Sequence, residues 1–172
     1  MKNAKLHLLI LIALLPFLHG CKKYPQNPYR PVLPYPITVY LSNAHFVDPS
    51  TDQYHDLNND YDWVYINADI ESTSRGIIVF HTSGNEFFAY DRMPPNEPDA
   101  CTDSQGNTTR LVVEFPFVVD HCNNAYYNIL NGQLIISDEY DMTPLFPTDG
   151  VVLFPLIQYH TQYFDGKLTI SN

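Results

Sequence analysis

Residues 76–91 read GIIVFHTSGNEFFAYD, two runs rich in β-branched and aromatic residues separated by Ser83, Gly84 and Asn85. Apolar runs of this composition around a short turn predict two antiparallel strands. The run at residues 120–132, DHCNNAYYNILNG, ends in another turn sequence and contains Cys122, and Cys101 lies between the two runs. We therefore take residues 75–132 as the centre of the fold.

Other short runs have the same strand-like composition and are bounded by turn residues. They cover residues 37–41, 63–66, 110–115, 133–136 and 167–170. No window of ten or more residues has a helical periodicity, and 13 Tyr and 10 Phe can supply a large core. Residues 37–172 are thus predicted to form one nearly all-β domain.

The first 20 residues have the pattern of a signal peptide. Lys2 and Lys5 precede an apolar run over residues 6–18, which is too short to span a bilayer comfortably. The following LHGC, residues 18–21, resembles the bacterial lipobox, in which the Cys is lipidated and becomes the first mature residue. The resemblance implies an exported protein held at a membrane by acyl chains on Cys21. The alternative is an uncleaved anchor helix.

Residues 21–36 are expected to be a tether. Pro25, Pro28, Pro31 and Pro34 recur every third residue, which matches the period of polyproline II. The fifteen residues 22–36 in that conformation would reach on the order of 45 Å. We interpret the segment as a spacer, with a docking motif for a proline-reading partner as the alternative.

The charge excludes some classes of partner. The whole chain has a net charge of −10, and removal of residues 1–20 would leave 7 of its 9 basic residues against 19 acidic ones, hence −12. Such a surface argues against nucleic acid and against electrostatic docking on anionic lipid.

With Cys21 lipidated, Cys101 and Cys122 remain as an even pair in an exported chain, where a disulfide is permitted. The loop between them would constrain the unfolded chain by about 3 kcal/mol.

We find no metal-binding or catalytic set in the sequence. Asp56, Asn58, Asp60 and Asp62 alternate like calcium-loop ligands. The EF-hand pattern also needs Gly and Glu where this chain has Tyr61 and Asn67, so a solvated loop is the favoured interpretation. The scattered His residues accompany no nucleophile elbow and no His-Glu-x-x-His helix. We therefore expect no enzyme, no metal and no cofactor.

Residues 76–92 resemble the first strands of Rieske-type iron–sulfur domains. The run YNILNG at 127–132 is similar to the Phe-Asp-x-x-Thr-Gly tail of the second ligand box, and GVVLFPL at 150–156 keeps the spacing of the family's Gly-Pro-Ala-x-x-Pro-Leu stretch. Residues 158–159, 165–166 and 168–170 match its closing strands. The resemblance covers residues 76–172 and implies a Rieske-like antiparallel β-sandwich or barrel with a small loop-rich subdomain.

The cluster ligands of that family are missing. The second-box Cys and His fall on Asp120 and Asn123, and the first-box positions hold Pro94 and Asn96. A Rieske cluster needs two thiolates on one iron and two imidazoles on the other, and none of these four groups is present. Val151 stands where the family has its cluster-covering Pro.

Cys122 occupies the position that forms a loop-clasping disulfide in the respiratory branch of the family, and Cys101 lies near the position of its partner. The resemblance thus implies a retained clasp around an emptied site. The competing interpretation makes Cys101, His121 and Cys122 the ligands of a metal, although three residues of which two are adjacent form a poor tetrahedral set.

Taken together, these patterns predict a Bacteroidetes-like lipoprotein, lipid-anchored in the bacterial envelope and facing the periplasm from the outer membrane. Its degenerate Rieske-like domain would be a cluster-free binding or structural module. The expected protein-binding surface is formed by residues 93–101 and 120–125. The alternatives are an electron-transfer protein with non-standard metal ligands and an immunoglobulin-like adhesin.

Overall fold

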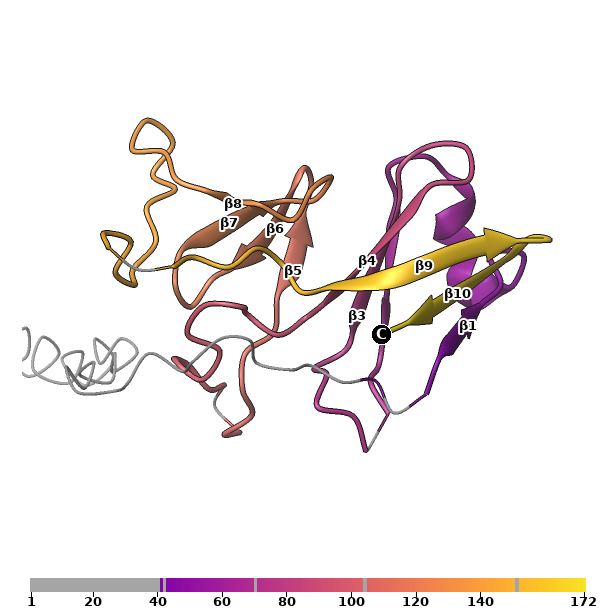
Figure 1. Cartoon of the computed structure of the whole chain (residues 1–172), viewed down its shortest axis with the longest axis horizontal. Helices are drawn as coiled ribbons and strands as arrows, with labels where there is room; N and C mark the ends of the chain where they lie inside the picture. Colours follow the sequence, from indigo (N-terminus) through magenta and orange to yellow (C-terminus); the bar gives the residue numbers. More distant parts are fainter. Residues whose placement is uncertain (1–40, 42, 70, 104, 151) are drawn as a thin grey trace, which may run out of the picture. The chain divides into compact units, whose positions relative to one another are not determined.

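The computed structural model describes residues 41–172 except residues 42, 70, 104 and 151 (Figure 1). The predicted signal peptide (1–20), Cys21 and its tether (21–36), most of the predicted strand at 37–41, and Val151 lie outside the described residues. Within the described part of the chain, no helix has the length and hydropathy of a membrane span.

Antiparallel β-strands dominate the described residues, which confirms the all-β prediction. A six-stranded sheet has the order β1-β10-β9-β4-β3-β2, and a four-stranded sheet has the order β5-β6-β7-β8. The first sheet consists of β1 (His45–Val47), β10 (Lys167–Ser171), β9 (Gln158–Phe164), β4 (Phe87–Asp91), β3 (Ile77–His81) and β2 (Trp63–Ile66). The second consists of β5 (Val112–Glu114), β6 (Phe117–Asp120), β7 (Ala125–Asn128) and β8 (Leu134–Ile135).

The strand β3 explains why the sequence at 77–81 is almost continuously apolar. All five of its residues are buried. Ile77 and Val79 belong to a core enclosed by the six-stranded sheet, whereas Ile78 and Phe80 belong to a second core shared with the four-stranded sheet. Because successive side chains of a strand point to opposite faces, a strand buried on both faces needs apolar residues at every position.

The predicted hairpin is present as β3 and β4, and its turn is closed by hydrogen bonds between Thr82 and Glu86 and between Glu86 and Ser83. The predicted strands at 63–66, 110–115, 133–136 and 167–170 correspond to β2, β5, β8 and β10. The sequence did not predict β1. The acidic segment that we expected to be a solvated loop is partly a 3₁₀ helix, η2 (Asp52–Asn58), whose Leu57 is buried in the first core.

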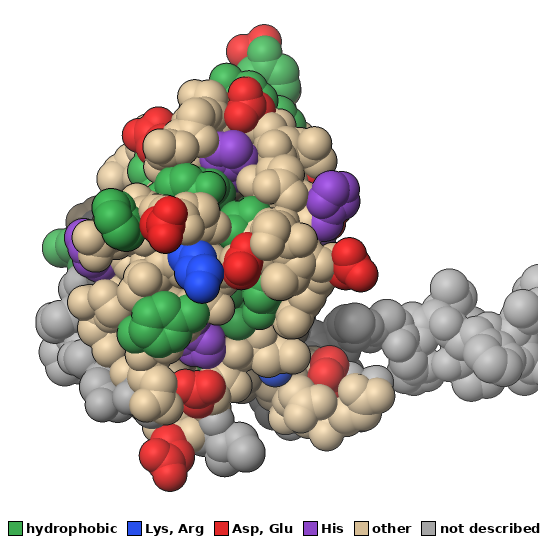
Figure 2. Space-filling model, turned by 90° about the vertical axis from the view of Figure 1, so that its right-hand side faces the viewer, with side chains coloured by type: hydrophobic (Ala, Val, Ile, Leu, Met, Phe, Trp, Pro, Cys, Tyr) green, Lys and Arg blue, Asp and Glu red, His purple; other side chains and the backbone are tan. Residues whose placement is uncertain are grey.

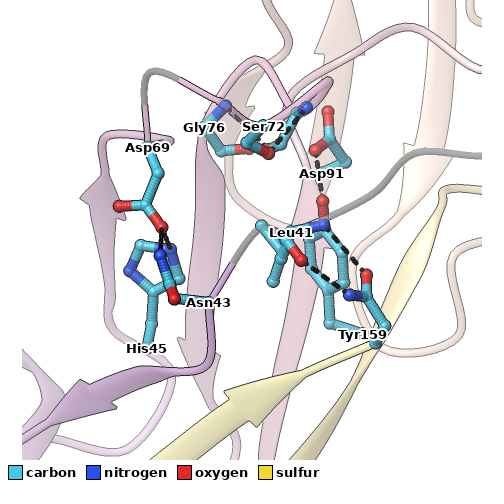
Figure 3. Close-up of polar contacts among 10 residues, drawn as sticks. Leu41, Asn43, His45, Asp69, Ser72, Gly76, Asp91 and Tyr159 are labelled. Atoms are coloured by element: carbon cyan, nitrogen blue, oxygen red, sulfur yellow. Dashed lines mark hydrogen bonds and ion pairs between the residues drawn. The ribbon is translucent and has the colours of Figure 1, made fainter.

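Asp91, at the end of β4, is a fully buried carboxylate that joins three segments. Its Oδ2 accepts a hydrogen bond of 2.5 Å from the Tyr159 hydroxyl of β9 (Figure 3), and its Oδ1 accepts one of 2.6 Å from the Met93 backbone N–H. Burial, with the Asp91 charge as a smaller cause, raises the pKa of Tyr159 above its ordinary value. Asp91 thereby fixes the start of the 93–101 segment against the six-stranded sheet.

Candidate functional site

Three loops meet beside the four-stranded sheet at the expected interaction surface. They are the segment after β4 (93–111), the turn between β6 and β7 (120–125) and the segment before β9 (150–157). All four positions at which the Rieske pattern has ligands are buried, namely Pro94, Asn96, Asp120 and Asn123.

Cys101 and Cys122 form a disulfide, as predicted, with Cα atoms 6.0 Å apart across 21 residues of sequence. It joins the first loop to the turn between β6 and β7. Neither cysteine therefore has a free thiol.

Asn96 joins the first loop to the third. Its side-chain amide accepts from the Phe154 backbone N–H at 3.0 Å and donates to the Phe154 carbonyl at 2.9 Å. The same Nδ2 donates to the buried Tyr127 hydroxyl of β7 at 3.0 Å. These bonds engage both heteroatoms of the amide, so the side chain closes the space between the loops.

Asp120 closes the second loop internally. Its Oδ1 accepts from the Cys122 backbone N–H at 3.0 Å, and its Oδ2 accepts from Asn123 Nδ2 at 2.7 Å. Burial raises the pKa of the Asp120 carboxyl, and the hydrogen bonds from Asn123 and Cys122 oppose that rise. The Asn123 carbonyl in turn accepts from the Leu145 N–H at 2.7 Å, which ties the 137–149 loop to this turn.

Arg75 holds the first loop against the start of β3. Its Nη1 donates to the carbonyls of Pro98 at 2.6 Å and Thr109 at 3.1 Å, and its Nη2 lies 2.8 Å from Asp99 Oδ1. A guanidinium presents its donors in a rigid fork, so one side chain can bridge both ends of the loop. The 98–109 segment is therefore held by Arg75 as well as by the disulfide.

A shallow cavity of about 520 Å³ adjoins the disulfide, between the 103–110 segment and residues 120–122. Its lining residues include Asp120 and His121. His121 is exposed, and its Nε2 lies 2.8 Å from Glu114 Oε1.

These side chains do not fit an iron–sulfur cluster. The four positions that align with the Rieske ligands carry a proline ring, two side-chain amides and one carboxylate, whereas the cluster requires thiolates and imidazoles. Asn96 and Asp120 are moreover committed to hydrogen bonds within the protein. Among the described residues, no group of three or more His, Cys, Asp or Glu side chains is placed to hold a metal ion.

Comparison with known proteins yields no relative. No family model, no curated protein and no solved structure matches the chain.

The sequence predicted the disulfide between the two cysteines, but it missed the hydrogen-bond partners that join the loops. Tyr127 and Phe154 are 31 and 58 residues from Asn96 along the chain. No local pattern marks an amide that pairs with a backbone so far away. The Arg75 bridge was missed for the same reason.

Two buried tyrosines of the second core allow a matched test of the Asn96 contact. The Tyr127 hydroxyl is hydrogen-bonded to Asn96, whereas the Tyr90 hydroxyl has no partner among the described residues. We expect Tyr127→Phe to lower the free energy of unfolding by about 1 to 2 kcal/mol, since a buried hydrogen bond is lost. Tyr90→Phe should not lower it, because the change removes a buried group without a partner. Urea unfolding measures both, and equal losses would contradict the assignment.

Proposed function

We propose that this chain is a membrane-anchored periplasmic lipoprotein whose Rieske-like domain lacks an iron–sulfur cluster and serves as a binding or structural module. One observation carries the proposal. At the positions where the family has its ligands, this chain has buried side chains, and Asn96 and Asp120 join or close the loops by hydrogen bonds. A site built in this way holds its loops together through the protein's own groups.

The protein-binding surface in this proposal consists of residues 93–101 and 120–125. The disulfide and the Asn96 contacts give these loops a rigid arrangement, which reduces the entropy lost on association. Two exposed apolar side chains lie near these loops. Leu145, 47% exposed, donates its backbone N–H to Asn123, and Val152, 73% exposed, lies two residues before Phe154. Exposed apolar area beside a rigid loop cluster favours a protein partner.

The alternatives are less well supported. A metal centre formed by Cys101, His121 and Cys122 would require the disulfide to be broken and His121 to leave Glu114. An immunoglobulin-like adhesin has Greek-key connections between its sheets, whereas the four-stranded sheet that carries the Cys122 turn has the sequential order β5-β6-β7-β8.

Expression in an iron-replete bacterial host tests both halves of the proposal. The full chain should sediment with the membranes, and after extraction it should be colourless and contain no stoichiometric iron. Cys21→Ser removes the thiol that would be lipidated, so that variant should not become labelled by a radioactive fatty acid. Visible iron–sulfur absorption would refute the cluster-free domain, and equal labelling of both chains would refute the lipid anchor at Cys21.

A further inference from the structure

A second surface lies along β2, away from the disulfide loops in sequence. An open groove of about 430 Å³ is lined by Gln53 and Asp56 of η2 and by residues 62–65. Trp63 and Tyr65 of β2 are partly exposed there, and 42% of the surface of Tyr65 is accessible to solvent. The groove has an aromatic wall formed by Trp63 and Tyr65, where the Arg92 guanidinium lies 4.1 Å from the centre of the Tyr65 ring, and an acidic wall formed by Asp56 and Asp62.

The strand β2 is the last strand of its sheet. It pairs with β3 on one side, and the described residues place no strand on the other. The free edge of a sheet presents backbone N–H and C=O groups that can pair with an added extended peptide. At this edge the Trp63 N–H donates to the Asp62 carboxylate at 2.9 Å, so an added peptide would displace that bond.

The two walls belong to opposite faces of β2. By strand alternation, Trp63 and Tyr65 share one face, and Val64 points to the other, where it packs in one core with Leu57 of η2. An added strand would alternate in the same way. Every second side chain would face the aromatic pair, and the others would face η2, which carries Asp56.

The net charge of residues 41–172 favours a basic peptide. All 19 acidic residues of the chain lie within residues 41–172, together with only Arg75, Arg92, Arg110 and Lys167, so this region has a net charge of −15. Figure 2 shows acidic side chains spread over the side of the molecule that carries η2 in Figure 1. A second copy of the chain would bring the same negative charge to the groove, whereas a cationic segment would be attracted.

We propose that the edge of β2 binds an extended segment of a partner protein in which Lys or Arg alternates with apolar residues. The peptide backbone pairs with β2, the apolar side chains contact Trp63 and Tyr65, and the basic side chains face Asp56 and Asp62. None of the residues lining the groove belongs to 93–101 or 120–125, so the proposal does not depend on the role proposed for those loops.

Trp63 is the only tryptophan of the chain, so its fluorescence reports on this groove directly. The full chain in mild detergent is titrated with a ten-residue peptide of alternating Lys and Val. We expect a saturable change in emission that weakens as NaCl is added. A Glu–Val peptide of the same length should give no change, and a Lys–Val peptide that is N-methylated at every residue should bind about tenfold more weakly or not at all, because it lacks backbone donors.

A matched pair of variants separates the groove from the overall charge. Asp56→Asn with Asp62→Asn should weaken binding about tenfold, whereas Glu139→Gln with Asp149→Asn removes the same two charges elsewhere and should have a much smaller effect. Equal losses in both variants, equal binding of the N-methylated peptide, or no emission change in the wild-type chain would overturn the proposal. A dimer in sedimentation that does not bind the Lys–Val peptide would show that a second copy occupies the edge, and it would overturn the proposal.

Discussion

Cys122→Ser should lower the melting temperature of the domain by more than about 5 °C. The disulfide joins residues separated by 21 positions, and a loop of that length restricts the unfolded chain by about 3 kcal/mol. The folded loops retain other connections, because Asp120 closes its turn and Arg75 bridges the first loop. Most of the loss should therefore come from the greater entropy of the unfolded chain.

The two cysteines also provide an internal control. Cys101→Ser should cost about as much as Cys122→Ser, and the double variant should cost no more than either single one, because all three lack the same bond. Differential scanning calorimetry of the four chains measures this. Additive losses, or an unchanged melting temperature after reduction, would show that the bond does not stabilise the domain.

Gly76→Ala should destabilise the domain by at least about 3 kcal/mol. Gly76 precedes β3 with a φ of +111°, a conformation that residues with a side chain rarely adopt. A Cβ added there would lie 2.9 Å from the Ile66 carbonyl oxygen, which belongs to the neighbouring strand β2. Because the nearest atom belongs to the backbone of β2 and not to a flexible side chain, relief of this contact requires the sheet to shift.

Gly84→Ala is the control for this change. Gly84 also has a positive φ, +63°, but nothing lies within 4 Å of the position of its added Cβ. Only the conformational penalty of about 1 kcal/mol should remain. Urea unfolding of the two variants separates the conformational penalty from the cost of the close contact with Ile66. Similar losses of stability at both glycines would mean that this contact is relieved without cost.

Local signals account for the parts of the fold that were predicted correctly. The β3–β4 hairpin follows from two adjacent apolar runs around Ser83 and Gly84, and the turn at Asp165 and Gly166 separates β9 from β10. Strands with weaker signals were not separated in advance. The strands β6 and β7 lie in one continuous run at 117–128 whose turn, at 121–124, has no proline or glycine.

The sheet order depends on pairings between distant segments. The strand β9 pairs with both β10 and β4, which joins the C-terminal hairpin to the central one across about 70 residues of chain. Such a pairing depends on which apolar faces can be buried together, and composition does not encode it locally.

For this protein, the sequence alone was enough to predict an all-β domain and the Cys101–Cys122 bond. These properties depend on residue identity and on near neighbours. The lipid anchor at Cys21 stays a prediction. Tertiary structure decided how the loops are held, through Asn96, Tyr127 and Phe154, and where the edge of β2 lies open beside Asp56. Both depend on contacts between residues far apart in the chain, which arise only when the two sheets have formed.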